Sequence, residues 1–211
     1  MIIFDLDHTL LKVNSSVHFG IFLYKKKIIR TLPFIFSIFD YGCHKWFNQS
    51  IQVLYEKSFS RFFKDHRLIL IQELADQFVS ENLTKLINEP VFKKLEEAKK
   101  RNEKTMILSS SPHFLVESIS KYLNVDGQGS SYICNEYGII TDSKDVFDGE
   151  TKAKYIKELS SQYHIPLSKM TTYSDSHLDL PLLKIVGKPV GVSPDRILKQ
   201  ICLENKWEII E

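Results

Sequence analysis

Four short apolar runs alternate with helical stretches along most of the chain, and this alternation constrains the fold more than any other feature. The apolar runs cover residues 2–6, 105–108, 170–173 and 190–192. Helical periodicity covers about 91–101, 114–123, 151–163 and 178–186. Such an alternation predicts parallel strands joined by crossover helices. We therefore expect an α/β fold, a doubly wound parallel sheet with helices on both faces.

Residues 13–89 interrupt this alternation. They hold most of the 14 phenylalanines and show helical periodicity without strand alternation. We interpret them as a helical cap inserted after the first strand, with residues 1–12 and 90–211 forming the core. Within the core, residues 132–142 around Gly138 predict a small hairpin attached to the sheet, and residues 207–210 predict a terminal edge strand.

The composition limits the classes of partner. Apolar residues make up 43% of the chain and charged residues 26%, as in soluble globular domains. The formal net charge of +2 is too small to attract nucleic acid strongly, so we expect no nucleic-acid partner. Cys43, Cys134 and Cys202 lack disulfide or zinc spacing and predict reduced thiols. Because two carboxylates near the N-terminus would defeat a signal peptide, we expect a cytoplasmic protein.

One basic and apolar segment leaves two interpretations open. Three lysines, Lys25 to Lys27, precede the apolar residues 28–39, which Arg30 and Pro33 interrupt. This run is too short to cross a bilayer, which needs about 20 apolar residues. The preferred interpretation is a buried cap helix with a solvated basic end. The alternative is peripheral contact of the cap with a membrane surface or a lipid-like substrate.

Polar residues follow three of the predicted strands directly. Asp5, Ser109 and Asp175 each stand where an apolar run stops. Because the carboxyl ends of parallel strands meet at one edge of a doubly wound sheet, we expect these side chains to share a crevice.

The residues after the first strand favour phosphoryl chemistry. Asp5 and Asp7 can serve one site if the chain bends after Asp5. One carboxylate can attack phosphorus, and the other can protonate the leaving alcohol and later deprotonate water. Clustered carboxylates repel and require a cation. Mg²⁺ fits because it uses few protein carboxylates, and Asp175 would supply a further oxygen.

The phosphoryl group also needs positive charge and hydrogen-bond donors. Lys152 begins a predicted helix and is the preferred cation, although Lys144, Lys154 and Lys157 lie nearby. Ser109 and the next backbone N–H groups, beginning with that of Ser110, would form a phosphate cradle before a helix start. Ser110 and Ser111 compete with Ser109 for this assignment.

These pieces resemble the haloacid dehalogenase-like phosphatases in order and spacing. Residues 5–9 (DLDHT) look like motif I, 107–109 (ILS) like motif II, Lys152 like motif III and 173–183 (YSDSHLDLPLL) like motif IV. An insertion directly after motif I is similar to the cap of the phosphoserine phosphatase-like branch. The stretches SSSPH and VGVSPD narrow the resemblance to the IB subfamily.

The resemblance implies roles for the matching residues. Asp5 would be the nucleophile and a metal ligand. Asp7 would be the general acid/base and would offer its backbone carbonyl to Mg²⁺, which Asp175 also binds. Thr9 and Ser109 would position the nucleophile loop and the phosphate.

The same resemblance implies that Lys152 neutralises negative charge at the site. It also implies that Asp179 either is held by Lys152 or contacts the metal ligands without binding the metal itself. The neighbouring histidines are expected to be loop or capping residues, because Mg²⁺ is a hard cation; they are His8, His113 and His177.

The sequence thus predicts a Mg²⁺-dependent phosphatase acting on a small phosphorylated metabolite through an aspartyl-phosphate. Asn14 stands where phosphoserine phosphatases have a glutamate for the substrate ammonium group, and this favours another substrate. The alternatives are a lipid phosphatase acting on phosphatidylglycerophosphate-like substrates and a phosphotransferase. A non-catalytic phosphoryl-binding module is disfavoured because no catalytic position is missing.

Overall fold

A six-stranded parallel sheet forms the centre of the molecule. The computed structural model describes residues 1–29, 56, 59–60 and 62–211. The strand order is β3-β2-β1-β6-β7-β8, and every neighbouring pair is parallel. The strands are β1 (Ile2–Asp5), β2 (Thr105–Pro112), β3 (Asp126–Ser130), β6 (Thr171–Ser174), β7 (Lys188–Val192) and β8 (Glu208–Ile210). The α/β prediction and the terminal edge strand are confirmed.

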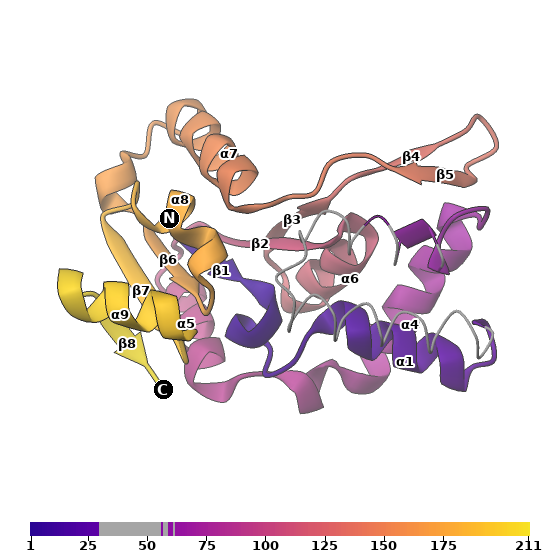
Figure 1. Cartoon of the computed structure of the whole chain (residues 1–211), viewed down its shortest axis with the longest axis horizontal. Helices are drawn as coiled ribbons and strands as arrows, with labels where there is room; N and C mark the ends of the chain where they lie inside the picture. The colour runs from indigo at the N-terminus through magenta and orange to yellow at the C-terminus, as the bar shows by residue number, and fades with distance from the viewer. Residues whose placement is uncertain (30–55, 57–58, 61) are drawn as a thin grey trace.

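Helices cover both faces of this sheet because its strands are apolar on both sides. Ile2 and Phe4 pack with α5 (Glu89–Lys100) and α6 (His113–Leu123). Ile3, which points the other way, packs with α7 (Gly149–Gln162) and α8 (Leu180–Leu183). On the side of α8, Leu183 also packs with α9 (Arg196–Asn205). Figure 1 shows this core at the left with both chain ends.

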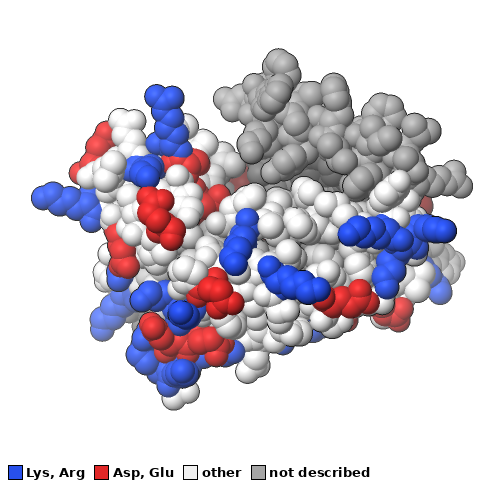
Figure 2. Space-filling model, turned by 90° about the horizontal axis from the view of Figure 1, so that it is seen from below, with Lys and Arg blue, Asp and Glu red and all other residues white. Residues whose placement is uncertain are grey.

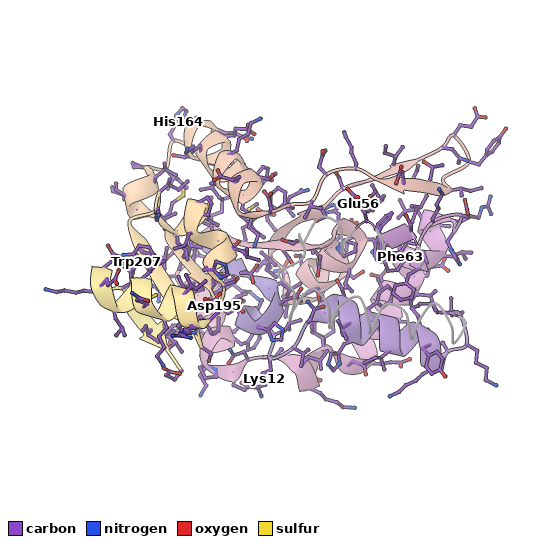
Figure 3. All side chains as sticks on the ribbon, in the orientation of Figure 1. Lys12, Glu56, Phe63, His164, Asp195 and Trp207 are labelled. Atoms are coloured by element: carbon purple, nitrogen blue, oxygen red, sulfur yellow. The ribbon has the colours of Figure 1, made fainter. Side chains whose placement is uncertain are left out.

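The described helices of residues 13–89 share one hydrophobic cluster with the core. They are α1 (Ser15–Lys25) and α4 (Leu68–Leu86). Phe114 on α6 contacts Phe19 of α1 and Phe63, with ring centroids 6.2 and 4.9 Å apart. Figure 3 places Phe63 on the same side of the molecule as α4 and α6. The domain boundaries stay a proposal, and residues 30–39 of the basic and apolar segment lie outside the described residues, as does Cys43.

The predicted hairpin exists, but its attachment was predicted wrongly. Strands β4 (Tyr132–Cys134) and β5 (Ile140–Ser143) pair only with each other in the described ranges. Ile139 bridges Arg67, and the backbone N–H of Leu68 donates to the carbonyl of Gly138 at 2.9 Å. The hairpin therefore reaches across to the residues before α4 (Figure 1). Its expected place beside the sheet is taken by β3, whose glycine-rich sequence gave no strand signal.

Two predicted boundaries also change. Strand β2 continues past Leu108 through the three serines to Pro112, with a register irregularity against β3. The single helix expected over residues 178–186 is broken into the short turn η3 (His177–Asp179) and α8. Pro181 lies at the start of α8 and has no N–H for a continuous helix across the junction. A further short turn, η2 (Leu167–Lys169), precedes β6.

Charged side chains of both signs are interspersed over the described part of the face seen in Figure 2. None of the helices in the described ranges is long and apolar enough to cross a membrane. Of the described cysteines, Cys134 is half-buried and Cys202 is buried, and both are free thiols.

Candidate active site

The three strand-end residues lie at the same edge of the sheet. Asp5 ends β1 and pairs in register with Leu108, so Ser109 is the next residue along β2. On the other side of β1, strand β6 ends at Ser174 and is followed by Asp175. The adjacency of β1, β2 and β6 therefore brings together residues more than 100 positions apart in the sequence.

Lys152 is the lysine that reaches this edge. Its Nζ lies 2.7 Å from Asp5 Oδ1, and 2.9 and 3.0 Å from the two carboxylate oxygens of Asp179. The residue is 2% exposed, whereas the three competing lysines are exposed: Lys144, Lys154 and Lys157. Burial alone would lower the pKa of Lys152, but the negative charges of Asp179 and Asp5 outweigh it and raise the pKa.

A close approach of two backbones positions this lysine. Gly149 begins α7, and a Cβ added there would lie 2.0 Å from the carbonyl oxygen of Leu178 in η3. Asp148 caps the helix, since its side chain accepts a hydrogen bond from Thr151 N at 2.9 Å. The start of α7 is thus held against η3, and Lys152 lies beside Asp179.

The three carboxylates near Lys152 differ in their hydrogen bonds and in what shifts their pKa values. Ser174 Oγ donates to Asp179 Oδ2 at 2.8 Å. Burial raises the pKa of Asp5 well above its usual value, and the charges of Asp179 and Asp175 add to this, although Lys152 opposes it. Burial also raises the pKa of Asp175 to about 6, although the charge of His8 and the hydrogen bond from Thr9 oppose this shift. That bond, from Thr9 Oγ1 to Asp175 Oδ1, measures 3.1 Å.

The donor set at this edge fits a magnesium ion that takes few protein side chains. The described residues contain no group of three or more His, Cys, Asp or Glu side chains placed to hold a metal. Asp5 and Asp175 nevertheless repel one another, and the pKa of each is raised. Two hard carboxylates whose charges repel suit Mg²⁺, which takes few protein carboxylates and completes its coordination with water and phosphate oxygens.

Asp7 is turned toward the first turn of α1. The backbone bends within η1 (Leu6–Leu10), where His8 has a φ of 58°. Asp7 Oδ1 accepts a hydrogen bond from Ser15 N at 2.6 Å, and Oδ2 accepts one from Ser111 Oγ at 2.8 Å. Asn14, the residue that departs from the phosphoserine phosphatase pattern, caps α1 by accepting from Val17 N at 3.0 Å.

The three serines of β2 have different hydrogen-bond partners, and the side chain of Ser110 lies on the opposite side of the strand from those of Ser109 and Ser111. Ser109 is buried, and its Oγ accepts from the backbone N–H of Ser111 at 3.1 Å. Ser110 Oγ donates to the carbonyl of Phe147 at 3.0 Å, so its side chain turns away from Asp7. Ser111 contacts Asp7, which sequence reasoning missed. The alternation of side chains along a strand could have found it, because it places Ser111 on the same side as Ser109.

Sequence reasoning also missed Asp195. Its backbone N–H donates to the carbonyl of Asp175 at 2.8 Å, and its Oδ2 accepts from His177 N at 2.7 Å and lies 2.8 Å from His177 Nδ1. Partial burial alone would raise the pKa of Asp195, but hydrogen bonds from Leu198 and His177 outweigh it and lower the pKa. In Figure 3 Asp195 lies beside α9, from where it holds the loop after β6.

One family model and several curated proteins match most of the chain. A family model described as haloacid dehalogenase-like hydrolase matches residues 2–184. The "inhibition of morphological differentiation protein" of Streptomyces azureus is 26% identical over 99% of this chain and 76% of its own length. A phosphoserine phosphatase of Mycobacterium tuberculosis is 23% identical over 98% of this chain and 68% of its own. A histidinol-phosphatase of Neisseria meningitidis is 24% identical over 99% of this chain and 96% of its own length.

Solved structures share the fold. A Bordetella pertussis protein of unknown function superposes with a TM-score of 0.87 at 16% identity, over 100% of this chain and 97% of that one. A substrate-bound phosphoserine phosphatase superposes with a TM-score of 0.72 at 17% identity, over 100% of this chain and 91% of that one. At these identities the likeness establishes the architecture.

Proposed function

The chain belongs to the haloacid dehalogenase-like hydrolase family, and from that membership we propose that it is a Mg²⁺-dependent phosphatase acting through an aspartyl-phosphate on Asp5. The observation that carries the proposal is the buried contact of Asp5 with Lys152, 2.7 Å apart at the end of β1. A carboxylate held beside a fixed cation, which a second carboxylate, that of Asp179, keeps in place, suits attack on a phosphate ester.

The proposed reaction has two displacements. In the first, Asp5 attacks phosphorus, the bond from phosphorus to the ester oxygen breaks, and Asp7 gives the leaving oxygen its proton. In the second, water attacks the phosphorus, Asp7 takes the proton of the water, and the bond to Asp5 breaks to release phosphate. Lys152 offsets the charge that gathers on Asp5 and on the phosphoryl oxygens.

The metal would be held by the carboxylates of Asp5 and Asp175 and the backbone carbonyl of Asp7. When bound, Mg²⁺ supplies positive charge to the phosphoryl oxygens. Ser109 follows Leu108, the residue of β2 that pairs with Asp5, and we propose that it binds phosphate together with the backbone that follows it. Thr9 is proposed to hold Asp175 in place, since its hydroxyl donates to that carboxylate. For Ser110 only the backbone N–H is proposed to bind phosphate, because its hydroxyl donates to Phe147.

We propose a small phosphorylated metabolite other than phosphoserine as the main substrate. The names of the relatives, a phosphoserine phosphatase and a histidinol-phosphatase, support a small phosphate monoester. Asn14 offers no charge to a substrate ammonium group, and its side-chain oxygen is engaged as the cap of α1. The described groups that hydrogen-bond to Asp7 are neutral: they are the side-chain amide of Asn14, the backbone N–H of Ser15 and the hydroxyl of Ser111.

A screen of phosphate esters with Mg²⁺, read by released phosphate, tests the proposal. We expect turnover of at least one small ester, a loss of at least about 1000-fold in Asp5→Asn, and an unchanged fold by circular dichroism. An Asp5→Asn variant that retains wild-type turnover would contradict the nucleophile assignment. Phosphoserine turning over far faster than every other ester would contradict the substrate proposal.

The same screen separates the alternatives. A lipid phosphatase would hydrolyse phosphatidylglycerophosphate in micelles and sediment with anionic vesicles; of the segment that suggested it, residues 30–39 lie outside the described ranges. A phosphotransferase would yield a new phosphate ester when a second alcohol is added. A non-catalytic binding module would bind phosphate esters without releasing phosphate from any of them.

A further inference from the structure

One hydroxyl group joins the end of β2 to the start of α1. Ser111 Oγ lies 2.8 Å from Asp7 Oδ2, 3.1 Å from Ser15 Oγ and 2.8 Å from Ser16 Oγ. Ser111 is 4% exposed, so water has little access to replace these contacts. Its backbone N–H is engaged separately, by Ser109 Oγ. We call the hydroxyls of Ser15, Ser16 and Ser111 the serine cluster.

The proton count determines the direction of the three hydrogen bonds. A hydroxyl donates one hydrogen bond and accepts two, and Asp7 Oδ2 accepts the bond from Ser111 Oγ. The single proton of Ser111 therefore goes to Asp7, and both Ser15 and Ser16 donate to Ser111. The hydroxyl of Ser111 then makes all three hydrogen bonds available to it, one donated and two accepted, and these bonds fix its orientation.

Both oxygens of Asp7 are consequently held from different elements. Oδ1 is held by the backbone N–H of Ser15 in α1, and Oδ2 by the side chain of Ser111 in β2. Without the second bond the carboxylate keeps only the short contact to Ser15 N and a 3.5 Å contact to Asn14 Nδ2, and it can turn about its side-chain torsions. An acid/base must be held close to the atoms it protonates, because proton transfer requires hydrogen-bond distance.

We propose that Ser111 is a positioning residue for Asp7, a role that rests on the proposed function. The hydroxyls of Ser15 and Ser16 fix the hydroxyl of Ser111, which in turn holds the Asp7 carboxylate in one orientation. The orientation of Asp7 therefore depends on how α1 packs against β2. Ser111 acts through Asp7 and has no contact with the reacting atoms in this proposal.

Leaving-group chemistry tests this role, because an alkoxide needs a proton on departure whereas a nitrophenolate departs as a stable anion. We would measure kcat/KM of Ser111→Ala for p-nitrophenyl phosphate and for the best alkyl ester of the screen, both with Mg²⁺. We expect kcat/KM to fall about 10-fold or more for the alkyl ester and less than about 2-fold for the nitrophenyl ester. Ser111→Thr keeps the hydroxyl and should restore the ratio.

Ser120→Ala is the matched control. Ser120 is also 4% exposed, and its hydroxyl has no hydrogen-bond partner among the described residues. We expect kcat/KM for both esters to stay at the wild-type value in this variant. In an Asp7→Asn background, Ser111→Ala should cause no further fall in kcat/KM for the alkyl ester. A residue that acts by orienting the Asp7 carboxylate has no effect once that acid/base is absent.

Other outcomes would overturn the inference. Equal losses for the two esters would mean general damage to the site, and no loss for either would mean that Asp7 needs no support from Ser111. If Ser111→Ala does not fold, Ser16→Ala, which removes only a bond onto Ser111, should show a smaller loss confined to the alkyl ester. A wild type that hydrolyses no ester contradicts the proposed function itself, and the inference falls with it.

Discussion

Lys152 illustrates how strongly one buried charge can depend on its neighbours. Its ammonium group contacts Asp5 at 2.7 Å and Asp179 at 2.9 Å, and the lysine and Asp179 are each nearly inaccessible to water. Removing one partner from a buried ion pair leaves the other charge without compensation, which costs more than the pair itself contributes. The lysine is therefore expected to serve stability as well as chemistry.

Lys152→Met should lower the free energy of unfolding by about 3 to 5 kcal/mol near neutral pH, because two buried carboxylates lose their cation. The loss should shrink in mildly acidic buffer, since the pKa of Asp5 is already raised and this carboxylate can bind a proton instead. Urea unfolding at two pH values measures both effects.

Lys157→Met on the same helix is the control for this change. Lys157 is exposed, so we expect an effect within about 0.5 kcal/mol. A Lys152→Met protein as stable as the control at neutral pH would contradict the view that the three charges are coupled.

Asp175→Asn should stabilise the metal-free protein while weakening its response to Mg²⁺. The folded pKa of Asp175, about 6, lies above the ordinary aspartate pKa of 3.8, so the folded state binds this proton more tightly than the unfolded chain does. Wild-type stability should therefore fall as the pH rises from 3.8 to about 6, and the penalty should be fully present above that window.

The variant should consequently gain about 1 to 3 kcal/mol of unfolding free energy at neutral pH and nothing below about pH 4. Removing Mg²⁺ with a chelator should lower the melting temperature of the wild type more than that of the variant. Thermal melts across the pH range, with Asp145→Asn as an exposed control, measure this difference. A gain that persists unchanged at acidic pH would contradict the electrostatic explanation.

At the scale of elements, the start of α7 determines where Lys152 lies. Gly149→Ala would force a Cβ toward the carbonyl oxygen of Leu178, 2.0 Å away in the present geometry, so the helix must shift. We expect a loss of about 1 to 3 kcal/mol and a fall in kcat as Lys152 moves from Asp5.

Gly20→Ala in α1 is the control, because no atom of the described residues lies within 4 Å of its Cβ position. Alanine favours a helix, so this variant should gain roughly 0.5 to 1 kcal/mol. Urea unfolding and steady-state turnover compare the two. A Gly149→Ala protein with wild-type turnover would contradict the role of this close approach.

The secondary-structure predictions succeeded where a signal lies within one element. The apolar runs and the helical periodicity placed β1, β6 and β7 and three of the core helices to within a few residues. The prediction missed β3, because the residues of DGQGS have low strand propensity and this segment becomes a strand only by pairing with β2. The prediction also stopped β2 at Leu108, since serines carry no apolar signal.

At the scale of the whole molecule, Phe114 joins three parts of the chain. Its ring contacts Phe19 of α1, Phe63 before α4 and Tyr132 of the hairpin, at centroid distances of 6.2, 4.9 and 5.6 Å. Phe114 is fully buried on α6, which belongs to the core. The aromatic contacts therefore hold α1, the residues before α4 and the hairpin against α6, which packs on the sheet.

Phe114→Ala should lower the free energy of unfolding by about 3 to 5 kcal/mol, because it removes a large side chain from a packed interior. Limited proteolysis should then cleave first between the inserted helices and the core. Leu203→Ala, at a residue 66% exposed on α9, is the control and should change stability little. A variant of Phe114 with wild-type stability would contradict a shared core.

The sequence by itself determined the α/β class, the family and the candidate residues that follow the strands. This was possible because strand and helix periodicity, and the spacing of Asp5 and Asp7, are local properties of the chain. Only the tertiary structure decided which of several lysines and serines reach these carboxylates. Lys152 is 147 positions from Asp5, and Ser111 is 104 positions from Asp7. Contacts at such separations depend on strand order and helix packing, which no short stretch of sequence encodes.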